Sequence, residues 1–164
     1  MLLSEKLTKL FNHQINQELY SAYLYLDFAE YFKHKNMPGF GHWYSVQAQE
    51  EISHASRLMD YMIEQGRCPE LREIKKPDIK IKDNISVGKE GLAHEVLITG
   101  MINNIYDAAM SERDYRTMEF LDWFVREQNE EEENACNMLA LLEQIDGNKA
   151  AIYFADLKMN GREV

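Results

Sequence analysis

Five residues of the types that bind hard metal ions lie inside apolar, helix-like stripes of this sequence. They are Glu18, Glu51, His54, Glu95 and Glu131, and they come from four separate segments. Burying a carboxylate is costly unless a partner neutralises its charge. A shifted pKa could accommodate one buried acid, but four acids and an imidazole on inward faces require a shared cation. The sequence therefore predicts a metal site inside a helical protein.

The stripes repeat every three or four residues, which keeps their side chains on one face of a helix. In each stripe the polar groups lie in the middle, and aromatic and aliphatic residues fill the ends. This pattern indicates a polar layer between two apolar cores. The polar members of the stripes are Gln14, Glu18, Gln47, Glu51, His54, Glu95, Thr99, Glu127 and Glu131, with Gln128 beside them.

The ligand types favour iron or manganese, because such ions prefer carboxylate oxygen and imidazole nitrogen to thiolate. Glu51 and His54 are three residues apart, so both project from one side of their helix. A carboxylate between two ions can bridge them, as in the di-iron carboxylate bundles. One such Glu-x-x-His pair occurs by chance on solvated helices. Its coincidence with acids on three other segments favours a metal centre.

Length and composition describe the setting of this centre. The chain has 164 residues, 45% of them hydrophobic, which suits a single domain over 1–164. It contains neither an apolar run long enough to cross a bilayer nor a signal-peptide pattern, so we expect a cytoplasmic protein that binds no membrane. The net charge of −10 also argues against nucleic acid as a partner.

The two cysteines, Cys68 and Cys136, have no CxxC spacing. They indicate neither a disulfide framework nor a zinc ribbon. We expect two free thiols that are buried or half-buried.

Start and stop signals divide the chain into five helices. Ser4 is the expected N-cap of the first helix, and Asp114 that of the fourth. The loss of helical period and two prolines over 67–85 predict an extended crossover, which is too long for a hairpin loop. The expected fold is all-α: a four-helix bundle over about 4–145 and a short fifth helix over about 149–159. The four long helices are expected at about 4–35, 40–65, 86–112 and 115–145.

Four motifs resemble those of the non-haem ferritins of bacteria and archaea, and the resemblance covers nearly the whole chain. It implies a ferritin-like four-helix bundle within a hollow, twenty-four-subunit shell. Such shells oxidise Fe(II) with dioxygen or peroxide and store the Fe(III) as a mineral. The motifs are NQELYSAYLY at 16–25, QEEISHA at 49–55, His94-Glu95, and FLDWFVREQNEEE at 120–132.

The resemblance also implies a ligand set. One iron would be held by Glu18, Glu51 and His54, and a second by Glu51 as the bridge together with Glu95 and Glu131, with Gln128 in its neighbourhood. A third, weaker iron site would consist of Glu50, Glu127, Glu130 and Glu131.

Two departures separate this chain from the similar bacterioferritins. Those proteins have a second ExxH motif in the fourth helix, where this chain has Glu127-Gln128-Asn129-Glu130. Their haem-binding methionine corresponds to Ile52 here. We therefore expect iron as the metal and no haem.

Three aromatic residues near the ligands leave alternatives open. Tyr25 shares a face with Glu18, and Trp123 lies on the fourth helix. Either could donate an electron, or it could be a packed ring with a hydrogen-bonded polar atom. His94 points about 100° away from Glu95 on a helix, which favours a hydrogen-bonded or surface histidine over a ligand.

Other classes of function compete with an iron-oxidising storage enzyme. A catalytically silent metal-buffering or structural cage subunit is the main alternative, although the complete ligand set favours the enzyme. A DNA-protecting mini-ferritin is disfavoured by the acidic charge and the lack of a basic tail. A di-iron oxygenase is disfavoured by the short chain and the missing second ExxH motif.

Overall fold

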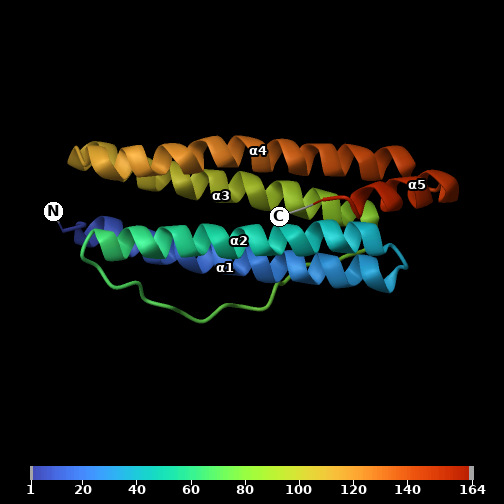
Figure 1. Cartoon of the computed structure of the whole chain (residues 1–164), viewed down its shortest axis with the longest axis horizontal. Helices are drawn as coiled ribbons and strands as arrows, with labels where there is room; N and C mark the ends of the chain where they lie inside the picture. The colour runs from blue at the N-terminus through green and yellow to red at the C-terminus, as the bar shows by residue number, and fades with distance from the viewer. Residues whose placement is uncertain (1, 163–164) are drawn as a thin grey trace.

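The computed structural model describes residues 2–162, and within them all regular structure is helical. Two antiparallel pairs, α1 with α2 and α3 with α4, lie side by side, and a short α5 follows at one end (Figure 1). This arrangement confirms the predicted all-α four-helix bundle. The helices are α1 (Glu5–His34), α2 (Pro38–Glu64), α3 (Asn84–Glu112), α4 (Tyr115–Ile145) and α5 (Lys149–Met159).

Side-chain caps determine where the helices begin. Ser4 accepts a hydrogen bond from the third backbone N–H of α1, and Asp114 does the same for α4, as predicted. Helix α3 begins at Asn84, two residues before the expected start. Asp83 is its N-cap, and Ser86 closes a reciprocal capping box with it. Ser86 is therefore inside the first turn of the helix and does not open it.

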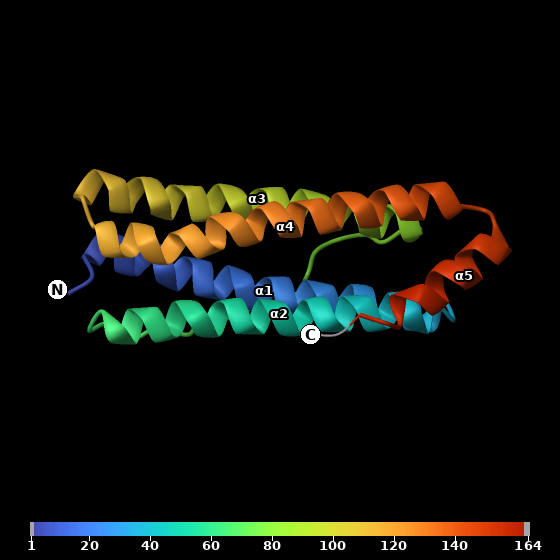
Figure 2. The same cartoon turned by 45° about the horizontal axis from the view of Figure 1, so that its top comes forward.

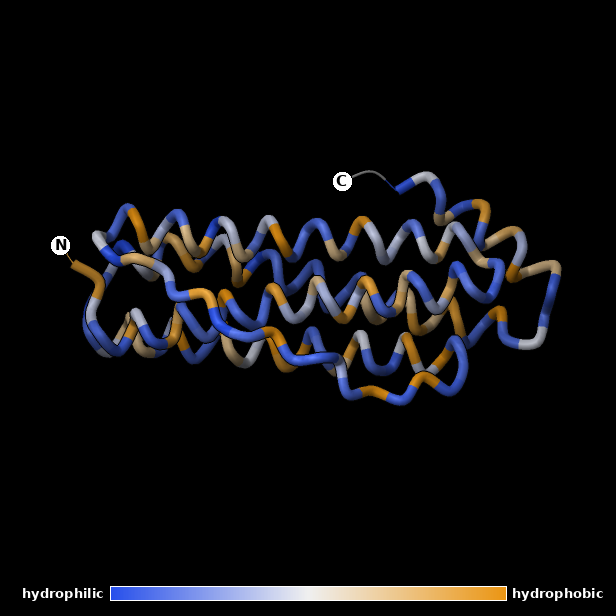
Figure 3. Tube along the Cα trace, turned by 90° about the horizontal axis from the view of Figure 1, so that it is seen from below, coloured by the Kyte–Doolittle hydropathy of each residue, from blue (hydrophilic) through white to orange (hydrophobic). Residues whose placement is uncertain are grey.

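The crossover between α2 and α3 is extended and runs along the outside of the bundle (Figure 3). Two asparagines of α1 hold it there. Asn12 Oδ1 accepts from the backbone N–H of Glu70 at 2.8 Å, and Asn16 Nδ2 donates to the carbonyl oxygen of Glu73 at 3.1 Å. The chain thus returns along the bundle before α3 begins, so α3 runs in the same direction as α2 (Figure 1).

Two apolar clusters fill the bundle, one toward each end, and the inward polar residues lie between them. Burial of these side chains supplies the main favourable free energy of folding. The first cluster includes Leu7, Phe11, Leu58, Ile102, Leu121 and Phe124, and the second includes Phe28, Phe32, Phe40, Tyr44, Val87 and Leu142. The predicted polar layer between two apolar cores is therefore present along the bundle.

Helix α5 turns back from the end of α4 and docks at the beginning of α2 (Figure 2). Asp156 Oδ1 accepts from the backbone N–H of Phe40 at 3.0 Å. The contact needs a glycine, because a Cβ on Gly39 would lie 1.7 Å from the carbonyl oxygen of Asp156. This docking directs residues 160–162 along α2.

The structure corrects the prediction for the cysteines. Cys68 and Cys136 are free, as expected, but both are exposed, so the expectation of buried or half-buried thiols is wrong. Cys68 follows α2 in the crossover, and Cys136 lies on the solvent side of α4. Neither position belongs to an inward stripe.

Within residues 2–162, every helix is too short or too polar to cross a membrane.

Candidate metal centre

The five residues singled out in the sequence meet in the polar layer of the bundle. Helix α1 supplies Glu18, α2 supplies Glu51 and His54, α3 supplies Glu95, and α4 supplies Glu131. Their exposed fractions lie between 1% and 4%. Such deep burial of four acids in one layer is unfavourable without a cation or protons.

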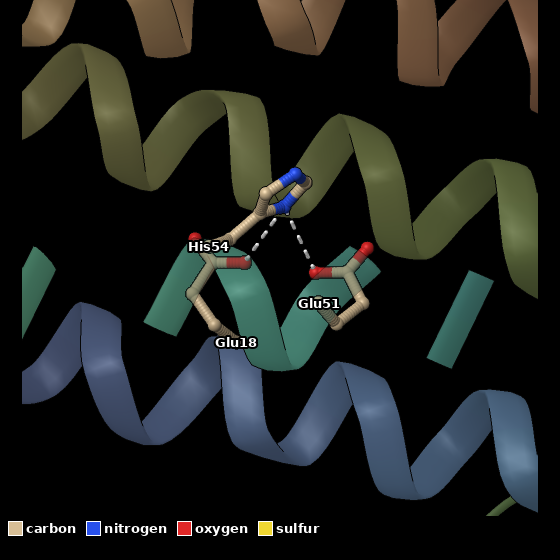
Figure 4. A group of neighbouring side chains, drawn as sticks. All are labelled: Glu18, Glu51 and His54. Carbon is tan, nitrogen blue, oxygen red and sulfur yellow. Dashed lines mark ion pairs between the residues drawn. The ribbon is translucent and has the colours of Figure 1, made fainter. Parts of the chain in front are cut away.

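Glu18, Glu51 and His54 form one group of ligand atoms. His54 Nδ1 lies 3.5 Å from Glu51 Oε2 and 4.0 Å from Glu18 Oε2. Figure 4 shows the imidazole above both carboxylates, with dashed lines to each. One atom from each residue lies within 4.8 Å of the others, which is close enough to hold one ion.

Glu51, Glu95 and Glu131 form a second group by the same criterion. Glu51 belongs to both groups, which is the position that a bridging carboxylate requires. Gln128 lies beside this group and its Nε2 donates to Glu95 Oε2 at 3.3 Å. The structure thus brings Gln128 into the neighbourhood of the second group as a donor to a ligand.

A third group consists of His54, Glu127 and Glu131. His54 Nε2 lies 3.7 Å from Glu127 Oε1. The other acids expected at a third iron site lie outside this group. Glu130 is exposed, and Glu50 forms an ion pair with Arg162.

Two buried glutamines orient the carboxylates, and sequence reasoning placed them in the stripes without giving them a role. Gln14 Nε2 donates to Glu18 Oε1 at 2.7 Å, and Gln47 Nε2 donates to Glu131 Oε2 at 2.6 Å. The available signal was spacing, because Gln14 and Gln47 each precede an acid ligand candidate by four residues. An amide one turn before a buried acid sits over the same face.

The other oxygen of Glu18, Oε2, is buried and has no hydrogen-bond partner in the described part of the chain. A buried acceptor without a donor is costly. This oxygen faces His54 in the first ligand group, so a cation there would satisfy it.

Burial raises the pKa of all four inward acids. For Glu131 burial, and then repulsion from Glu95, raises the pKa to about 8. For Glu51 burial acts first, and the charges of Glu95 and Glu131 add to it. Without metal the centre therefore keeps protons near neutral pH, and a bound cation would displace them.

The structure also locates the aromatic residues left open by the sequence. Tyr25 is buried and donates through its hydroxyl to Glu95. Burial, and then the charge of Glu95, raises the pKa of Tyr25, so its hydroxyl stays protonated. Trp123 meets His54 nearly edge-on, with ring centroids 5.5 Å apart. A redox role for either ring stays a prediction.

His94 is hydrogen-bonded, one of the two states expected for it. Its Nε2 lies 2.6 Å from Ser21 Oγ. Burial lowers the pKa of His94 to about 4, so the ring is neutral at pH 7.

A layer of acids and one imidazole between four helices has the residue types and the arrangement of the carboxylate metal sites found in helical bundles. A family model described as a ferritin-like domain matches residues 8–145. The chain belongs to this ferritin family, and the predicted resemblance is confirmed.

Among its relatives is the bacterial non-heme ferritin of Campylobacter jejuni, 34% identical over 155 residues, which are 94% of this chain and 93% of the relative. The bacterial non-heme ferritin of Escherichia coli O157:H7 is 34% identical over 160 residues, which are 98% and 96% of the two chains.

Solved structures show the same similarity. An open pore ferritin of Archaeoglobus fulgidus superposes with a TM-score of 0.95 at 37% identity and covers 98% of this chain and 99% of its own. A humanized archaeal ferritin gives a TM-score of 0.95 at 40% identity, with 98% of each chain covered.

Proposed function

We propose that this protein stores iron and oxidises Fe(II) at an intrasubunit di-iron centre. The observation that carries the proposal is the sharing of Glu51 between two groups of ligand atoms. One group contains Glu18 and His54, and the other contains Glu95 and Glu131. Two ions held on either side of one carboxylate are close enough to react with the same oxidant.

The chemistry balances with iron as substrate. Two Fe(II) ions give one electron each, and two electrons with two protons reduce dioxygen to hydrogen peroxide, or peroxide to two waters. Carboxylate ligands favour the more highly charged Fe(III) product by electrostatic attraction. The raised pKa of Glu131 lets the metal-free centre hold a proton, which a metal ion must displace.

The neighbouring acids support a third iron site on the α2–α4 side of the centre. Glu127 lies beside His54 in the third ligand group, and Glu131 belongs to both the second and third groups. Glu50 and Glu130 would complete the site, which requires Glu50 to exchange its ion pair with Arg162 and the exposed Glu130 to turn toward the centre. Fe(III) leaving the second position would then meet further carboxylate oxygens on its way to the mineral.

Haem is not part of the proposal. Ile52 occupies the position where similar haem-binding ferritins carry methionine, and its hydrocarbon side chain has no donor atom for haem iron. The proposal includes a cytoplasmic location and a homo-oligomeric shell of twenty-four subunits. Both come from the resemblance of the sequence motifs to non-haem ferritins.

The main test is stopped-flow oxidation of Fe(II) by metal-free protein, comparing the unchanged chain with Glu51→Ala and His54→Ala. We expect the initial rate to fall at least roughly tenfold in both variants, because each loses a ligand that every catalytic step requires. Glu133→Ala is the matched control, since Glu133 is an exposed acid of α4. Equal, slow rates in all four proteins would exclude a ferroxidase.

The same preparations distinguish the alternative, a metal-buffering or structural cage subunit. For such a subunit, Glu51→Ala and His54→Ala would weaken the binding of Zn(II), which has no redox chemistry. The same two substitutions would leave the rate of Fe(II) oxidation unchanged. Light scattering reports the assembly, and a monomer that accumulates no iron would contradict the storage function itself.

A further inference from the structure

A positively charged residue of this chain, Arg162, contacts the acidic site. Arg162 Nη2 lies 2.5 Å from Glu50 Oε2, and Arg162 Nη1 donates to Gln47 Oε1 at 2.9 Å. The guanidinium therefore bridges two neighbouring side chains of α2. One of them is an expected iron ligand, and the other is the amide that donates to Glu131.

Several contacts hold Arg162 in this position. Its guanidinium carbon lies 4.2 Å from the centroid of the Trp43 ring, and its backbone carbonyl oxygen lies 2.8 Å from His42 Nε2. The docking of Asp156 on the first turn of α2 directs the tail here. The placement thus results from several independent contacts along residues 156–162.

The arrangement connects Arg162 with the metal centre through one side chain. Gln47 accepts from Arg162 through Oε1 and donates to Glu131 through Nε2 at 2.6 Å. An amide that is fixed at both ends cannot rotate freely, so Glu131 is held in one orientation. Trp43 also lines a small cavity that reaches Glu95 and Glu131. The tail therefore contacts two residues that line this cavity, Trp43 and Gln47.

A guanidinium and a metal ion compete for the same carboxylate oxygens. The guanidinium of Arg162 can donate two parallel N–H groups to the carboxylate of Glu50. A metal ion attracts the same carboxylate through a higher charge on a smaller ion. With Arg162 on Oε2, one oxygen of Glu50 is occupied and a positive charge stands beside the other. Binding of a metal ion to Glu50 is therefore opposed for as long as Arg162 stays in contact with it.

We propose that Arg162 is a built-in competitor of iron at the Glu50 side of the third site, and that its displacement also frees Gln47 and Glu131. The inference rests on the third iron site of the proposed function. With Arg162 in place, Glu131 is held at the di-iron centre and Glu50 is occupied. A metal ion that displaces the tail gains Glu50 and loosens Glu131, the acid shared by the second and third ligand groups.

The test uses Zn(II) alone as a redox-inert probe on the assembled, metal-free full chain. Calorimetric titration of the unchanged protein and of Arg162→Ala measures the affinity of the ion that binds after the first two. We expect Arg162→Ala to bind this ion roughly two- to tenfold more tightly, the range of a partly exposed ion pair. Arg72→Ala is the matched control, because Arg72 pairs with Glu70 on the crossover, away from the centre. It should leave the affinity unchanged.

A second readout follows the tail directly. In a Trp123→Phe background Trp43 is the remaining tryptophan, and its emission should change as the third ion removes the guanidinium from its ring. Adding Arg162→Ala should abolish that change. Arg162→Lys keeps the charge but loses the planar fork, so its Zn(II) affinity should lie between those of the other two proteins.

The outcomes separate the two proposals. If Glu50→Gln weakens the third ion while Arg162→Ala leaves its affinity unchanged, the competitor role of Arg162 is overturned and the iron site stands. If neither the unchanged protein nor Arg162→Ala binds a third ion, or if Glu50→Gln changes nothing, the third site fails and the inference fails with it. Circular dichroism and light scattering confirm that each variant is folded and assembled.

Discussion

Replacing Glu131 by glutamine should remove a large part of the pH dependence of metal-free stability. Glutamine preserves the shape of the side chain and can still accept from Gln47. It cannot ionise, and it removes the negative charge next to Glu51 and Glu95. The structure therefore predicts a variant whose metal-free form is less sensitive to pH than the unchanged protein.

The sign follows from the direction of the pKa shift. Burial raises the pKa of Glu131 from 4.5 to about 8 in the folded protein. Between these values the folded chain holds a proton that the unfolded chain has released. The contribution of Glu131 to the free energy of unfolding is therefore fully present below pH 4.5, and it is lost as the pH rises toward 8.

Between about pH 5 and pH 7 the folded chain holds this proton and most unfolded chains do not. While the folded state holds one more proton than the unfolded state, each rise of one pH unit lowers the free energy of unfolding by about 1.36 kcal/mol. The unfolded carboxyl is partly protonated at the lower limit, so the free energy of unfolding falls by roughly 2.5 kcal/mol over the interval. For a chain of this length that corresponds to a Tm lower by roughly 5 to 10 °C.

Thermal melting followed by circular dichroism in a chelator measures this effect. The unchanged protein should lose this increment of Tm between about pH 5 and pH 7, and Glu131→Gln should retain it. Glu133→Gln, an exposed acid two residues away, is the control and should follow the unchanged protein. Light scattering at each pH checks that the assembly is the same. Parallel curves for Glu131→Gln and the unchanged protein would refute the assignment of the proton to this buried site.

Three further substitutions test the apolar core, the docking of α5 and the hydrogen bond from Tyr25 to Glu95. Leu121→Ala should lower the free energy of unfolding by about 2–5 kcal/mol, because Leu121 is fully buried in the first apolar cluster. Denaturant unfolding measures this loss, and Leu71→Ala is the control that should leave the free energy unchanged, because Leu71 is exposed. Gly39→Ala should detach α5 while the bundle stays folded, because the added Cβ overlaps the carbonyl of Asp156; faster hydrogen exchange confined to 149–162 would show this. Tyr25→Phe removes the donor to a buried carboxylate and should cost about 1–3 kcal/mol in the metal-free protein, and an unchanged Tm would contradict that role.

The main helices were predictable because the spacing of apolar residues in the sequence matches the spacing of inward-facing residues on a helix. Inward residues such as Phe11 and Phe28 recur at helical spacing, and Ser4 and Asp114 mark helix starts with their own side chains. The start of α3 was less clear, since Asp83 and Ser86 are both competent caps. Only the reciprocal hydrogen bonds show that Asp83 has the outer position.

The candidate ligands were predictable for a different reason. An acid in an apolar stripe conflicts with its surroundings, and that conflict is visible without a structure. Glu18 and Glu95 are examples. Gln14 and Gln47 were harder to interpret, because a neutral amide in a stripe is only a mild exception. Gln14 reaches Glu18 within α1, but Gln47 reaches Glu131 on α4, and only the tertiary structure shows which carboxylate oxygen each amide contacts.

The contact of Arg162 could not be predicted at all from local pattern. It depends on the direction in which α5 leaves α4, and that direction depends on the fit between Gly39 and Asp156. Such a fit between residues more than one hundred positions apart has no periodicity. The exposure of Cys136 is a different case, because its position outside the inward stripe of α4 already indicates the solvent side.

Charge balance gives a physical reason for product to leave the centre. In the proposed function, the carboxylates of Glu18, Glu51, Glu95 and Glu131 would together supply four negative charges, which match two Fe(II) ions in a buried layer. Oxidation of both ions would add two positive charges, and excess charge in a buried layer is strongly unfavourable. Two further acids lie on the side where Arg162 is bound: Glu127, which is close to His54 and Glu131, and the half-buried Glu50. The same excess charge would repel the guanidinium, so oxidation itself would weaken the contact that occupies Glu50.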